Sequence, residues 1–124
     1  MSLNRATLVG YVGQEPVIRW LDTGTCVASV SLGTKEKGYT LQNGTQVPER
    51  TEWHNIIFWN KQAELVEEYV HKGDKLFVEG KIQSRFYDDK SGIRRQVVEI
   101  MAHTVEFLSG RGSGVETAQK PQTP

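Results

Sequence analysis

Two tryptophans lie six residues apart in the stretch TEWHNIIFWN, residues 51–60. Side chains on a strand alternate between its faces with a period of two, so Trp53 and Trp59 would point to the same face of one strand. At roughly 3.3 Å per residue their separation is about 20 Å, which suits separate bases along one nucleic-acid strand. Because every base has an aromatic face, such rings could bind single strands irrespective of sequence. Packing in a core is the alternative that residue type alone leaves open.

Basic residues that could contact phosphates are concentrated between residues 81 and 95, although the whole chain has 15 basic and 15 acidic residues. A nucleic-acid binder with zero net charge needs its positive charge on one side. Arg85 and Tyr87 alternate onto the same side of a strand, which places a cation beside a stacking ring. A solvated surface is the alternative interpretation of this segment. The candidate phosphate contacts are Lys81, Arg85, Arg94 and Arg95, with Lys61 and Lys72, which flank a predicted helix, as weaker candidates.

Catalysis and metal binding are not indicated by the remaining polar residues. The three histidines and the single cysteine, Cys26, do not have the spacing of metal ligands, so we expect neither a metal nor a cofactor. Asp88 and Asp89 are adjacent in a turn and would point apart, which argues against paired acid–base catalysis. The GRGSG stretch lacks the Lys-Ser/Thr ending of a phosphate-binding P-loop. We therefore expect a binding protein and not an enzyme.

Targeting signals and disulfides are not indicated either. One cysteine cannot form an intrachain disulfide, which is typical of cytosolic proteins. No apolar run approaches the roughly 18–20 residues of a membrane span, and the N-terminus lacks the apolar region of a signal peptide. We therefore predict a cytoplasmic protein, associated with the nucleoid if its ligand is DNA.

The elements that position these residues are predicted to be strands with a single helix. An apolar stripe at helical spacing, with Tyr69 on its core side, predicts one helix between Asn60 as N-cap and Gly73. The dipeptide Asn43-Gly44 predicts a hairpin or a projecting loop. Apolar runs bounded by turn residues predict extended segments over residues 6–12, 17–21, 26–32, 51–59, 75–87 and 94–108.

This order of elements predicts an all-β fold. Five or so strands, with one helix before the last pair, are typical of a five-stranded Greek-key barrel of the OB type. We expect this OB-type domain to cover residues 1–108. Residues 109–124 are rich in Gly, Ser, Gln and Pro and have almost no apolar content, which predicts a flexible tail.

Several blocks of the sequence resemble the bacterial single-stranded DNA-binding protein family. They are NRATLVGYVGQEPVIRW, TEWHNIIFWNKQAELVEEYVHKGDKLFVEGKI and DDKSGIRRQVVEI, in the family's order and with nearly its spacing. The resemblance covers residue 4 to about residue 108. It implies an OB-fold, a homotetramer and sequence-independent binding of single-stranded DNA in replication, repair and recombination. It also implies that the protein has no catalytic activity and needs no metal.

The resemblance further implies which residues contact DNA and other subunits. The family's four stacking positions correspond here to Tyr39, Trp53, Trp59 and Tyr87. His54 matches a family position at the subunit interface. Trp20, beside Leu21 and before a turn, fits either a core position or a DNA contact.

Two departures restrict what the resemblance implies. Asn55 stands where the family has an arginine, which removes one candidate phosphate contact. The family's tail usually ends in an acidic, Phe-terminated tip that recruits repair and replication proteins, whereas this chain ends in KPQTP. Either the sequence is truncated or this member lacks that docking role, so we do not expect partner recruitment through these residues.

Two other functions remain open from the residues alone. An accessory protein of the primosome type would use an OB-fold dimer to bind single strands and chiefly to dock other proteins. An OB module could instead bind a protein or an oligosaccharide. A dimeric state would favour the first alternative, and failure to shift any oligonucleotide would favour the second.

Overall fold

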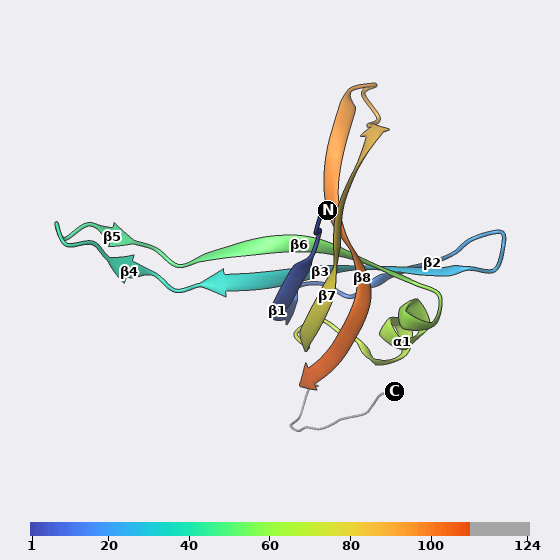
Figure 1. The fold of residues 1–124 in the computed structure, drawn as a ribbon, viewed down its shortest axis with the longest axis horizontal. Helices are drawn as coiled ribbons and strands as arrows, with labels where there is room; N and C mark the ends of the chain where they lie inside the picture. Colours follow the sequence, from blue (N-terminus) through green and yellow to red (C-terminus); the bar gives the residue numbers. More distant parts are fainter. Residues whose placement is uncertain (110–124) are drawn as a thin grey trace.

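The computed structural model describes residues 1–109, so most of the tail expected over residues 109–124 lies outside the described residues. The strands are β1 (Ala6–Val12), β2 (Val17–Trp20), β3 (Cys26–Glu36), β4 (Tyr39–Thr40), β5 (Gln46–Val47), β6 (Arg50–Trp59), β7 (Lys75–Asp88) and β8 (Arg94–Ser109), and the helix is α1 (Lys61–Tyr69). Six strands pair in the order β1-β7-β8-β6-β3-β2, and a further β1–β3 pairing closes five of them into a barrel (Figure 1). The predicted OB-type barrel with one helix is confirmed, with β2 as an additional strand beside β3.

Strand β1 closes the barrel because it pairs on both of its sides. It runs antiparallel to β7 between Ala6 and Tyr11. At its end, Tyr11 pairs with Gly33 of β3. Gly10 permits this approach, since a Cβ atom there would overlap the backbone carbonyl of Gly33. The barrel therefore closes where two strands meet through glycine backbone.

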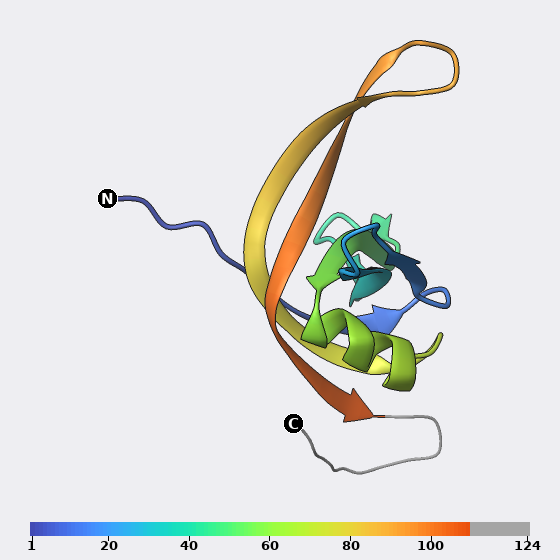
Figure 2. The same cartoon turned by 90° about the vertical axis from the view of Figure 1, so that its right-hand side faces the viewer.

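Two hairpins project from the barrel in different directions (Figures 1 and 2). Strands β7 and β8 remain paired as far as Asp88 and Arg94, which carries this hairpin well beyond the barrel. Strands β4 and β5 form a separate two-stranded sheet. The turn predicted at Asn43-Gly44 is confirmed: Gly44 has a φ of 88° and its N–H donates to the carbonyl of Leu41.

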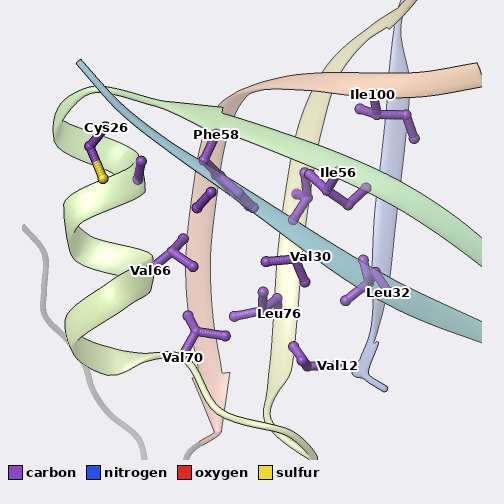
Figure 3. Packing of buried hydrophobic residues seen from close by; sticks show 13 residues of the cluster. Val12, Cys26, Val30, Leu32, Ile56, Phe58, Val66, Val70, Leu76 and Ile100 are labelled. Atoms are coloured by element: carbon purple, nitrogen blue, oxygen red, sulfur yellow. The ribbon is translucent and has the colours of Figure 1, made fainter. Parts of the chain in front are cut away.

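The hydrophobic core lies between the barrel strands and α1 (Figure 3). Alternate residues of β3 face inward and are fully buried, as the alternation in the sequence predicts. The helix adds its buried stripe, and Phe58 of β6 lies beside it with no exposed surface. The labelled core residues include Cys26, Val30, Leu32, Phe58, Val66 and Val70.

Helix α1 begins directly after its predicted N-cap, Asn60, but it ends earlier than the sequence predicts. Asn60 adopts a φ of 58° and its side chain makes no capping hydrogen bond. The helix ends at Tyr69 and not near Gly73, because Val70 turns into an extended conformation and is buried in the core. Tyr69 was expected in the core, but 55% of its surface is exposed and its ring packs against Phe107 at 6.1 Å between centroids.

Candidate nucleic-acid interface

Trp53 and Trp59 lie on the outer face of β6. Ile56 and Phe58 of the same strand are buried in the core, so the alternate positions point outward. The exposed fraction is 56% for Trp53 and 43% for Trp59. The two rings therefore share one face of one strand, and both are accessible, which agrees with the expectation drawn from their spacing.

The Trp53 ring rests on the sheet because two glycines lie beneath it. Gly33 pairs with Trp53 across β3 and β6. A Cβ atom at Gly33 would lie 2.7 Å from Cζ3 of the ring, and one at Gly13 would also overlap the ring. One side of the indole is thereby supported by backbone. A supported aromatic side chain loses little freedom when a base stacks on it, which favours binding.

Trp20 lies on the opposite face of the sheet from Trp59. It pairs with Cys26, which points into the core, and directly paired residues share a face. The outer row at this end runs from Trp59 through Val27 to Arg19. Arg19 is thus a cation on the tryptophan face that the sequence analysis missed. Arg19 and Trp20 are adjacent on one strand and must point to opposite faces. The sequence could therefore have indicated the face of Arg19 if the face of Trp20 had been known.

Tyr87 and Arg85 extend the same outer face onto the β7–β8 hairpin. Asn55 of β6 is level with Glu99 of β8, which pairs with Gln83 of β7, and Arg85 and Tyr87 follow at alternate positions. The Arg85 guanidinium lies 5.9 Å from the centroid of the Tyr87 ring. It also donates two hydrogen bonds to the buried Glu99 carboxylate, at 3.1 and 3.2 Å. These hydrogen bonds, with the carboxylate charge, raise the pKa of Arg85 above its ordinary value.

Arg94 and Arg95 make contacts within the hairpin. The Arg94 guanidinium lies 4.7 Å from the centroid of the Phe86 ring, on the opposite face from Tyr87. Arg95 donates a 2.8 Å hydrogen bond to the Asp89 carboxylate near the hairpin tip. This hydrogen bond holds the pKa of Asp89 below its ordinary value, and hydrogen bonds from backbone N–H groups of the turn contribute to a smaller extent. Arg95 pairs with Tyr87 and therefore shares its face near the tip, whereas Arg94 lies on the opposite face.

The three predicted lysines occupy different places. Lys81 pairs with Met101 and is level with Ile57, which puts it on the outer face between the two tryptophans. Lys61 is the first residue of α1, two positions after Trp59. Lys72 follows the other end of the helix, where its backbone N–H donates to Glu15. Only Lys81 of the three lies on the tryptophan face by strand register.

Tyr39 and His54 occupy two further positions outside the tryptophan row. Tyr39 lies on the projecting β4–β5 hairpin and is 59% exposed. His54 is half-buried on the inward side of β6, where Nε2 is 2.9 Å from the hydroxyl of Thr34. Asn55, which stands at the position of the family's arginine, is exposed on the outer face between the two tryptophans. The hairpin tyrosine is thus available to a ligand that extends beyond the barrel.

Metal clusters and membrane-spanning helices are not found in the described part of the chain. Within residues 1–109, no group of three or more His, Cys, Asp or Glu is arranged to hold a metal ion. Within the same residues, no helix has the length and apolar character needed to cross a membrane.

Comparisons of the sequence with known proteins identify one family. The model of the "Single-strand binding protein family" matches residues 3–108. A protein named single-stranded DNA-binding protein from Bacteroides thetaiotaomicron is 54% identical over 113 residues, which are 91% of this chain and 70% of that protein. One of the same name from Neisseria meningitidis is 42% identical over 111 residues, 90% of this chain and 63% of that protein. The chain therefore spans about two thirds of the length of these relatives.

Comparison with solved structures gives a similar result. A chain of the structure titled "Plasmodium falciparum SSB complex with ssDNA" matches with a TM-score of 0.79 and 31% sequence identity. The match covers 88% of this chain and 97% of that chain. The similarity thus extends over almost the whole of the described barrel and its hairpins.

Proposed function

This chain belongs to the single-strand binding protein family, and from this membership we propose that it binds single-stranded DNA irrespective of base sequence. The observation that carries the proposal is the pair of exposed rings, Trp53 and Trp59, on one face of β6. Stacking of a base on an aromatic side chain contributes about 1–3 kcal/mol and does not depend on base identity. A row of such rings binds a strand of any sequence.

The proposed binding path follows the outer face of the barrel onto the hairpins. Lys81 and Arg19 lie on this face by strand register and are placed to meet phosphates. Arg85 lies beside Tyr87, although Glu99 already compensates part of its charge. Arg95 pairs with Tyr87 and shares its face, although Asp89 compensates part of its charge. Arg94, Lys61 and Lys72 have weaker geometric support as phosphate contacts. The proposed stacking residues are Tyr39, Trp53, Trp59 and Tyr87.

The proposed cellular role follows from the family and from the bacterial relatives. Proteins of this family are non-enzymatic DNA binders, so we assign the chain no catalytic step. Its role is to cover and protect single strands during replication, repair and recombination. Its place is the bacterial cytoplasm, with the DNA of the nucleoid.

The proposed assembly is a homotetramer, with His54 at a subunit interface. Strand β1 pairs with β3 only at Tyr11 and Val12 within the described residues, so the edge between Ala6 and Gly10 is available to a strand of another subunit. Light scattering of the full chain should give four times the 14.0 kDa of one chain. A dimer mass would contradict the tetramer and favour the primosome-type alternative.

Tryptophan fluorescence during titration with an oligo-dT strand tests the binding function. Stacking of bases on Trp53 and Trp59 should quench the emission, and duplex DNA of the same length should do little. Raising the salt concentration should weaken binding, because each phosphate contact contributes about −0.7 to the slope of log affinity against log salt on a single strand.

Two controls make this titration decisive. Oligo-dC and oligo-dA strands of equal length should quench to a similar extent, since stacking tolerates every base. Absence of quenching by all three strands, with the protein still folded by circular dichroism, would refute single-strand binding at these rings. A gel-shift with the same oligonucleotides then separates a binding site elsewhere from a different class of ligand.

A further inference from the structure

A transverse row of four residues crosses the outer face of the barrel at the level of Trp53. Lys75 of β7 pairs with Tyr11 of β1, Tyr11 pairs with Gly33 of β3, and Gly33 pairs with Trp53 of β6. Directly paired residues share a face, so all four lie on the outside. The row therefore consists of a cation, an aromatic ring, a glycine and a second aromatic ring, and the Trp53 ring extends over the glycine.

A depression in the surface lies beside this row, with Gly33 in its lining. Its volume is about 260 Å³, below the roughly 300–1,000 Å³ of pockets that hold drug-sized ligands, so it suits a group the size of one base. Tyr11 and Trp53 both line it, and Tyr11 is 53% exposed. The lining residues are Tyr11, Val12, Gly33, Lys35, Thr51 and Trp53.

Two lysines place positive charge close to this depression. Lys35 is one of the lining residues, and it pairs with Thr51 on the outer face of β3 and β6. Lys75 pairs with Tyr11, and its ammonium lies 5.7 Å from the centroid of the Tyr11 ring. The lining includes no carboxylate. Aromatic side chains that line a depression, with lysines nearby, are complementary to a base and its neighbouring phosphates.

We propose that this depression holds one base of the bound strand, with Tyr11 as a second stacking wall opposite Trp53. This inference rests on the proposed single-strand binding and adds a residue to it, because Tyr11 matches none of the four stacking positions that the family resemblance implies. Lys35 and Lys75 contact the phosphates on either side of that base. A single strand of DNA is the ligand, and the base is bound through its aromatic face.

Affinity measurements on Tyr11 variants test the inference. Tyr11→Ala should weaken oligo-dT binding by roughly fivefold or more, the lower end of what one stacked base contributes. Tyr11→Phe should bind within about twofold of the wild type, because the ring remains. Tyr69→Ala is the matched control: this tyrosine is 55% exposed, lies on α1, and should leave the affinity unchanged.

A photo-cross-link locates the contact directly. An oligo-dT strand carrying 5-iododeoxyuridine is irradiated with the wild-type protein, and tryptic peptides are identified by mass spectrometry. A cross-link is expected in the peptide of residues 6–19, whose only aromatic residue is Tyr11, as well as in that of residues 51–61, which holds both Trp53 and Trp59.

Three outcomes would overturn the inference. The first is cross-linking confined to other peptides, and the second is equal affinity of the Tyr11→Ala and Tyr69→Ala variants. The third is a reduced mass of Tyr11→Ala in light scattering that accounts for its weaker binding, which would make Tyr11 a subunit contact. If the wild type binds oligo-dT while any of these is found, only the Tyr11 contact fails. If the wild type does not bind, the proposed function fails as well.

Discussion

Replacing Trp53 with alanine should weaken binding of an oligo-dT strand by about 5- to 150-fold, the equivalent of one lost base stack. The ring lies over Gly13 and Gly33, and Trp53 is more than half exposed, so its removal takes away a supported stacking surface and little of the core. The loss should be similar for oligo-dA and oligo-dC, because stacking does not read the base. Fluorescence anisotropy with labelled oligonucleotides measures all three affinities.

Trp20→Ala is the matched control for this experiment. Trp20 is 55% exposed against 56% for Trp53, but its pairing with Cys26 places it on the other face of the sheet. Its removal should change the affinity by less than about twofold. Equal losses of affinity in the two variants would show that binding does not depend on which face of the sheet carries the tryptophan. Unfolding of Trp53→Ala would show that the ring is part of the core, and either result would contradict the proposed interface.

Replacing Phe58 with alanine should lower the free energy of unfolding by about 3–5 kcal/mol, the usual cost of removing a fully buried phenylalanine. Phe58 has no exposed surface and lies on β6 beside α1 (Figure 3), so the cavity would open between the helix and the barrel. Single domains are stable by only about 5–15 kcal/mol, so this one change removes a large part of the total. Urea denaturation at fixed protein concentration measures the loss.

Phe86→Ala provides the same chemical change at an exposed position. Phe86 lies on the β7–β8 hairpin and is 55% exposed. Its ring packs against the guanidinium of Arg94, which belongs to the same hairpin. Its removal should cost less than about 1 kcal/mol, since surface substitutions usually have small effects. A denaturation midpoint of Phe58→Ala equal to that of Phe86→Ala would mean that the core is not where the structure places it.

Local patterns in the sequence determined the elements and the sidedness of individual strands. The alternation from Cys26 to Leu32 predicted which residues of that strand face the core. The even spacing of Trp53 and Trp59 predicted that both point to the same face of their strand. Asn43-Gly44 marked its turn. These predictions were correct because the alternation of side chains along a strand and the backbone conformation of a turn depend only on residues close together in the sequence.

The C-terminal end of the helix was not determined locally. Asn60 is the N-cap, as its residue type predicts, although it has a positive φ and its side chain makes no capping hydrogen bond. Val70 leaves the helix because burial in the core stabilises the extended conformation there. Gly73 was therefore the wrong end signal, since the position of the core outweighed the local preference for glycine.

Only the tertiary structure decided which charges and rings are adjacent. Glu99 lies fourteen residues from Arg85 and compensates its charge, so a basic segment in the sequence became a partly neutral strand. Tyr11 and Trp53 belong to strands separated by a third, and they flank one depression because β1 closes onto β3 at Gly33. Such juxtapositions depend on strand register and barrel closure, which are set by burial of the whole core and not by any local pattern.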